Sequence, residues 1–168
     1  MKKYGFTKEE RSSFPYWFAH WCAFQMVALN CHRWKFKYLF HDIYKPWLRL
    51  FMSYDKVQMF HNKHSNHHLL YVFVNGMKKV DWEAMIIDWE CSRFTKHAAQ
   101  LNAKDEAERI ISTFRSFDMS NKTVRQLDRL GMLPDKTDMA DFLERGWYNF
   151  MVDRIEEHLK ETIEKLNL

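Results

Sequence analysis

Apolar residues recur along most of the chain at the three-to-four-residue spacing of helices. Over residues 14–34 they occur around the whole helical cylinder, so we expect this first helix to be central and covered on most sides. Ser12 or Ser13 can cap the helix, and Pro15 falls in its first turn, where a missing amide costs nothing.

The same pattern predicts further helices over residues 41–54, 56–68, 81–97, 104–117, 120–131 and 138–166. Pro46 should lie near the start of its helix, and Asp81 and Ser120 are expected N-caps. Gly131 is expected to end the helix over residues 120–131. Residues 69–74 are rich in β-branched and aromatic side chains, so this segment is either a short extended stretch or helical.

Composition agrees with an all-α fold, because the 168 residues include only four Gly and three Pro for tight turns. Aromatic residues make up 17% of the chain, which predicts a bulky core packed around rings. We therefore expect a single compact helical domain over residues 1–168, with a functional core at about 14–97 and covering helices at about 104–168.

Charge and cysteine content restrict the partners. The net charge of +4 is spread over short groups, which argues against nucleic acid as the main partner. Cys22, Cys31 and Cys91 form no CxxC pair and no secretory leader is visible, which predicts a reduced, cytoplasmic protein. No apolar stretch reaches the length of about 18 residues that a membrane span needs.

The long last helix has enough apolar surface for a homodimer contact, and the oligomeric state stays open.

Five of the nine histidines fall between residues 41 and 68, a density that is typical of a metal site when carboxylates accompany it. On a continuous helix, His61, His64 and His68 would share one face. His41 and Asp42 are adjacent and can serve one ion only where the backbone bends. The alternative is an ordinary polar surface, on which His97 and His158 are also expected.

Asp88 lies within the apolar run Ala84-Met85-Ile86-Ile87-Asp88-Trp89. A buried carboxylate without a partner destabilises a fold, so an ionised Asp88 requires a cation. Either a metal ion or a salt bridge to Arg93 or Lys96 would satisfy it.

Four elements now stand in a fixed order: His20, His41-Asp42-Ile43-Tyr44-Lys45, the run over residues 61–68, and Asp88. This order resembles the H…HD…D pattern of the HD-domain superfamily of metal-dependent phosphohydrolases. More narrowly, it resembles an uncharacterised bacterial and phage family of HD-like domains. The resemblance covers about residues 16–95 and implies a helical fold with a divalent metal ion (Mn, Fe, Zn, Co or Mg).

The resemblance assigns roles residue by residue. One ion would be held by His20, His41, Asp42 and Asp88, while His61 with His67 or His68 would hold a second ion or contact phosphate. Lys45 would steady phosphate charge. His32 is an alternative to His20, but a helix separates the two by about 18 Å, so both cannot bind one ion, and we favour His20. In one respect the chain departs from the pattern, because Ala84-Met85 stands where we expect Glu-Met and Glu83 is displaced by one position.

The expected function is hydrolysis of a nucleotide or another small phosphate ester by metal-activated water, oriented by Asp42. A histidine that is not used as a ligand, His64 or His68, would protonate the leaving oxygen. Tyr44, Trp47 and Trp89 are candidates for the cleft wall. The alternatives are a metal- or nucleotide-binding regulatory domain without turnover, and a structural bundle with satisfied core histidines.

Overall fold

The computed structural model describes residues 5–7, 10–96, 102–133 and 146–168, and every regular element in these ranges is helical. Two short 3-10 turns accompany the α-helices: η1 (Glu10–Ser12) and η2 (Phe36–Phe40). The α-helices are α1 (Phe14–Asn30), α2 (Lys45–Leu48), α3 (Tyr54–His64), α4 (Leu69–Asn75), α5 (Trp82–Thr95), α6 (Ala103–Arg115), α7 (Lys122–Arg129) and α9 (Trp147–Leu166). The predicted all-α fold is confirmed. Of the helices described, none is both long enough and apolar enough to cross a bilayer.

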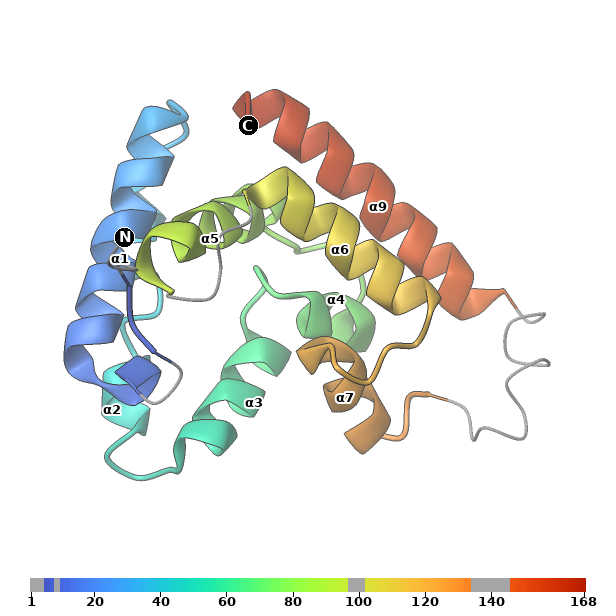
Figure 1. Ribbon diagram of the computed structural model, residues 1–168, viewed down its shortest axis with the longest axis horizontal. Helices are drawn as coiled ribbons and strands as arrows, with labels where there is room; N and C mark the ends of the chain where they lie inside the picture. The colour runs from blue at the N-terminus through green and yellow to red at the C-terminus, as the bar shows by residue number, and fades with distance from the viewer. Residues whose placement is uncertain (1–4, 8–9, 97–101, 134–145) are drawn as a thin grey trace.

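The central helix is α5, not the first helix of the chain. Figure 1 shows α5 between α1 on one side and the pair α6 and α9 on the other, and it packs against all three. Its Met85, Ile86 and Ile87 are fully buried. Although α1 is apolar all round, it lies at one end of the molecule and not at its centre. One of its faces is buried, as expected, and another face is exposed.

The first helix starts where the sequence predicts and ends earlier. Ser13 caps it by accepting a hydrogen bond from the amide of Tyr16 at 3.3 Å, and Pro15 lies in the first turn. The helix ends at Asn30 instead of Trp34, because His32 adopts a left-handed backbone conformation with φ of 54°.

The second predicted helix, over residues 41–54, is mostly turns. Before Tyr54, which begins α3, only α2 is α-helical, with Pro46 in its first turn as expected. The backbone amides of Phe51 and Met52 bond back to Leu48, which tightens the chain and ends the helix.

The predicted helix over residues 56–68 ends at His64, because Ser65 is extended and its amide closes the last turn on His61. Asn66 then ties the following loop to residues 79–81, since its side chain donates to Lys79 and its carbonyl accepts from Asp81. After this loop, residues 69–75 form the helix α4, not an extended segment. Its apolar side chains are buried, and among the described residues there is no strand with which this segment could pair.

The remaining helices follow the sequence pattern with small shifts. Asp81 caps α5 by accepting from the amide of Ala84 at 3.2 Å. The cap of α7 is Asn121, whose side chain accepts from two amides, while Ser120 bonds to Asp118 instead. Gly131 follows α7 with φ of 65°, as its predicted role requires. His97 and residues 138–145 of the predicted last helix lie outside the described residues.

Candidate metal centre

Five parts of the chain bring histidines and aspartates to one buried place. The first helix, α1, carries His20, and the turn after η2 carries His41 and Asp42. The remaining members come from α3, from the loop before α4 and from α5: His61, His67, His68 and Asp88. Because α1 and α5 pack side by side, His20 and Asp88 face each other across the pair.

A backbone bend lets the adjacent His41 and Asp42 face the same point. Asp42 has φ of 57°, a left-handed conformation that aspartate tolerates better than most residues. The indole nitrogen of Trp17 donates to the carbonyl of Asp42 at 2.9 Å, and the amide of Lys45 donates to the same oxygen at 3.0 Å. These two bonds hold the bend that the sequence pattern required.

The first group consists of His20, His41 and Asp88. Asp88 Oδ1 lies 2.8 Å from His20 Nε2 and 3.6 Å from His41 Nε2. On the other side of the His20 ring, Cys91 Sγ lies 3.5 Å from Nδ1. No salt bridge from Asp88 to Arg93 or Lys96 is present, since Arg93 pairs with Glu90 and Lys96 bonds to Ser92.

Asp42 connects this group to the other histidines. Its Oδ1 lies 3.1 Å from His61 Nε2 and 3.7 Å from His67 Nε2, and its Oδ2 lies 3.6 Å from His41 Nε2. Lys45 Nζ is 2.5 Å from the same Oδ2, so the lysine balances part of the charge of the aspartate.

The loop before α4 turns His67 and His68 back toward His61. The Nε2 atoms of His61 and His68 are 2.6 Å apart, so only one of them can carry a hydrogen. His64 points elsewhere: its Nδ1 lies 2.8 Å from the carbonyl oxygen of Phe60 and its ring stacks on Phe60. The expected common face of His61, His64 and His68 is therefore wrong, because α3 ends before His68.

Tyr44 and Ser65 fix the orientation of His61. The Tyr44 hydroxyl lies 2.5 Å from His61 Nδ1 and 2.5 Å from Ser65 Oγ, and Ser65 Oγ is 2.9 Å from the same Nδ1. With Nδ1 engaged by two hydroxyl groups, Nε2 faces Asp42 and the other histidines. Such outer contacts commonly set the tautomer of a ligating histidine.

The electrostatics favour ionised carboxylates beside neutral imidazoles. Burial acts to raise the pKa of both aspartates, but their neighbours outweigh it and hold both pKa values well below the usual range. The opposing groups are chiefly His41 and Lys45 for Asp42, and His20 and His41 for Asp88. Burial lowers the pKa of three imidazoles: His20, His61 and His68. This is the protonation state in which such side chains bind a cation.

Three overlapping sets have ligand atoms that all lie within 4.8 Å of one another: His20–His41–Asp88, His41–Asp42–His67, and His61–His67–His68. Within the middle set, His41 Nε2, Asp42 Oδ1 and His67 Nε2 are buried and make no hydrogen bond. Buried polar atoms without partners are costly, and nitrogen and oxygen donors at this separation fit a first-row divalent ion. The cluster could therefore hold a metal ion.

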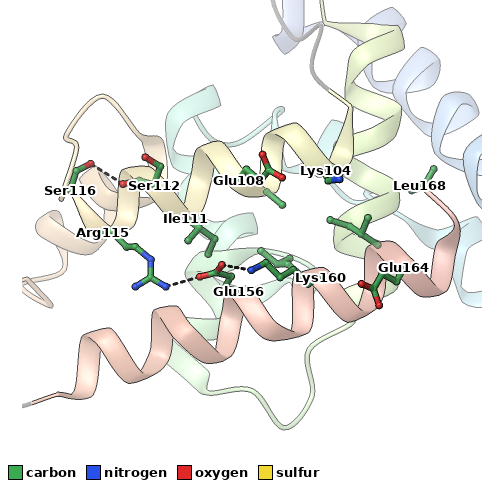
Figure 2. A pocket seen from close by; sticks show the side chains of 13 residues that line it. Lys104, Glu108, Ile111, Ser112, Arg115, Ser116, Glu156, Lys160, Glu164 and Leu168 are labelled. Atoms are coloured by element: carbon green, nitrogen blue, oxygen red, sulfur yellow. Dashed lines mark hydrogen bonds and ion pairs between the residues drawn. The ribbon is translucent and has the colours of Figure 1, made fainter.

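A cleft of about 420 Å³ opens beside the cluster and is bordered by His41, Asp42 and His67. Tyr44 and His64 also line it, whereas Trp47 and Trp89 are not among its lining residues. A larger groove of about 800 Å³ runs between α6 and α9 (Figure 2), and no member of the cluster reaches it. Its walls carry surface ion pairs such as Arg115 to Glu156, so the smaller cleft is the entrance that concerns the cluster.

Three supporting residues were not anticipated from the sequence: Trp17, Ser65 and Cys91. Cys91 lies three positions after Asp88, a spacing that places both on one helix face and could have indicated it. Ser65 lies inside the histidine-rich run, but nothing local shows that it contacts His61. Trp17 is separated from Asp42 by 25 positions, and no sequence signal connects them.

Comparison with family models, with curated proteins and with solved structures finds no match for this chain.

Proposed function

We propose that this chain is a metal-dependent phosphohydrolase that cleaves a small phosphate ester, with a divalent ion held by its buried cluster. The observation that carries the proposal is the set of three buried atoms without hydrogen bonds, His41 Nε2, Asp42 Oδ1 and His67 Nε2. A buried nitrogen left without a hydrogen bond, such as His41 Nε2 or His67 Nε2, costs the fold on the order of 1–3 kcal/mol. Two ions, one contacting His41 and Asp42 and the other contacting His67, would remove this cost.

His20, His41, Asp42 and Asp88 would hold one ion, and His61 with His67 and His68 would hold a second. When bound, a divalent ion supplies a Lewis acid that activates water near neutral pH and neutralises phosphate charge. Asp42, which reaches both groups, would orient the attacking water. Lys45 contacts Asp42 and is about one-fifth exposed. It is not among the residues that line the cleft, so it would balance phosphate charge through Asp42 and not by direct contact.

The size and lining of the cleft favour a small phosphorylated substrate, such as a nucleotide. Its volume of about 420 Å³ lies in the range of small-molecule sites. Phe40 and Tyr71 offer aromatic walls, and Lys79 contributes positive charge at the rim. His64 also lines the cleft and His68 does not, so His64 is the better placed of the two to protonate a leaving oxygen.

The test is the metal content of the purified protein, measured by elemental mass spectrometry. We expect about one or two equivalents in the wild type and a loss of most of this metal in His41→Ala and Asp88→Ala. His32→Asn is the matched control, because His32 is exposed and asparagine tolerates its left-handed backbone. This variant should keep its metal.

Hydrolysis is then assayed with nucleotides and simple phosphodiesters. Release of phosphate or a nucleoside product by the wild type, lost in both cluster variants, is the expected result. Bound metal without turnover of any ester would instead favour a metal- or nucleotide-binding regulatory domain. Absence of metal, with unchanged melting in both variants, would contradict the proposal and favour a structural bundle.

A further inference from the structure

One face of α1 is apolar and uncovered. The helix lies at the end of the molecule, packed on α5 by the face that carries His20 (Figure 1). Its outward residues follow the spacing of one helix stripe: Phe14, Phe18, Cys22, Met26 and Leu29. The four large members are 62%, 52%, 62% and 56% exposed, in that order, and Cys22 is half-buried between them. A helix that is apolar on all sides is normally covered on all sides. From this exposed stripe we propose that α1 is the interface of a homodimer.

Charge favours a second copy as the occupant. Residues 14–30 contain no Asp, Glu, Lys or Arg, so two identical stripes can meet without burying a charge. Membrane-surface helices instead carry Lys and Arg along the flank of the apolar stripe. The lysines of the neighbouring turn are not free for that role, since Lys35 and Lys37 pair with Glu83 and Asp81.

The apolar surface continues onto the turn beside α1. Trp17 and Trp21 lie at the edge of the stripe and donate their indole hydrogens to the carbonyls of Asp42 and Leu39. These bonds fasten residues 39–42 alongside α1, where Phe40 and the adjacent Ile43 are 56% and 42% exposed. The stripe and this turn together form a single apolar face.

The area is sufficient for a dimer. The six large exposed side chains of this face present roughly 600 Å², taking a fully exposed large side chain as about 200 Å². One partner in a standard interface contributes about 800 Å², polar rim included. Four stripe members are spaced four residues apart and form the ridge used in the commonest helix–helix packing, which crosses at about 50°. Cys22 is the middle member, so the two Cys22 residues lie near the two-fold axis.

The experiment is sedimentation of the full chain over a concentration series that reaches high micromolar. We expect a monomer–dimer equilibrium in the wild type. Phe18→Lys and Met26→Lys should each raise the dissociation constant at least about tenfold, because a lysine in this face must be buried against the apolar face of the second copy. Phe150→Lys is the matched control, since Phe150 is 61% exposed on α9, and it should dimerise like the wild type.

Melting temperatures confirm that all three variants are folded. A bis-maleimide cross-linker adds a readout that leaves the large apolar side chains intact: it should join two wild-type copies and two Cys31→Ser copies, but not Cys22→Ser. A wild type that stays monomeric at all concentrations would overturn the proposal. So would a dimer whose dissociation constant is unchanged by both stripe substitutions and which the reagent does not cross-link through Cys22. Pelleting of a monomeric wild type with phosphatidylcholine–phosphatidylglycerol vesicles, lost in Phe18→Lys, would also overturn it and assign the face to a lipid surface.

Discussion

Tyr44 contributes to the candidate centre through its hydroxyl group and not as an aromatic wall alone. The hydroxyl contacts His61 Nδ1 and Ser65 Oγ, so it holds the ring that directs Nε2 toward Asp42. Removing such a contact from behind a ligating histidine commonly weakens metal binding by about 10- to 100-fold. Tyr44 therefore offers a test of the centre that leaves every proposed ligand in place.

We expect Tyr44→Phe to weaken divalent-ion binding by about tenfold or more, measured by isothermal titration calorimetry. The physical reason is that His61 loses one of the two hydroxyl groups that hold its orientation. Tyr71→Phe is the control. Tyr71 lines the same cleft, and none of the hydrogen bonds or ring contacts of the described residues joins it to His61. Equal affinities for wild type and Tyr44→Phe would show that His61 needs no such support or binds no metal.

At the scale of the elements, the end of α4 depends on Gly76. This residue has φ of 78° and ψ of −178°, a conformation that is essentially restricted to glycine, and its amide bonds to Val72. No atom beyond Gly76 and its two chain neighbours lies within 4 Å of the position that a Cβ would take, so a side chain would be strained by the backbone and not by crowding. The glycine lets the chain leave α4 and return toward α5.

Gly76→Ala should lower the free energy of unfolding by about 1–3 kcal/mol, measured by urea denaturation. Gly131→Asn is the comparison. Gly131 follows α7 with φ of 65°, and the amide of the next residue, Met132, donates a hydrogen bond to the carbonyl of Leu127. This is an ordinary left-handed helix cap, which asparagine adopts at little cost. A Gly76→Ala protein as stable as the wild type would mean that the chain after α4 relaxes into a different turn.

At the scale of the whole molecule, the buried cluster should make stability depend on pH. Burial lowers the pKa of His20, His61 and His68 in the folded, ion-free protein, whereas in the unfolded chain these residues take up protons near pH 6.5. Below that pH the unfolded chain binds more protons than the folded one, so acidification favours unfolding.

We expect the free energy of unfolding of chelator-treated protein to be level above about pH 7. Below about pH 6.5 it should fall by up to about 1.4 kcal/mol per pH unit for each of the three histidines. Asp42 and Asp88 add a second loss at lower pH, because their lowered pKa values stabilise the fold only while they stay ionised. Urea titrations over this range measure the slope. His68→Asn should flatten it, His158→Gln should not, and a level profile down to about pH 5 would contradict the buried cluster.

Much of the fold was predictable because its signals are local. Ser13 and Asp81 cap the helices that the sequence assigned to them, and Gly131 ends its helix as predicted. The first helix shows the limit of such signals. Its uniform apolar pattern indicates burial on all sides. The face that packs on α5 and the face that is exposed at the end of the molecule carry the same kind of residues, so the local pattern does not distinguish them.

By itself, the sequence determined the helical class and most helix starts, and it placed Asp88 in an apolar helical run that indicates burial. These follow from residue periodicity, cap chemistry and composition, which act over a few neighbouring positions. Only the tertiary structure decided that α5 is central, that residues 69–75 are helical, and that His67 and His68, not His64, join His61. Each of these features depends on contacts between residues that are far apart in the sequence, because such contacts set the course of the loops and the packing of the helices.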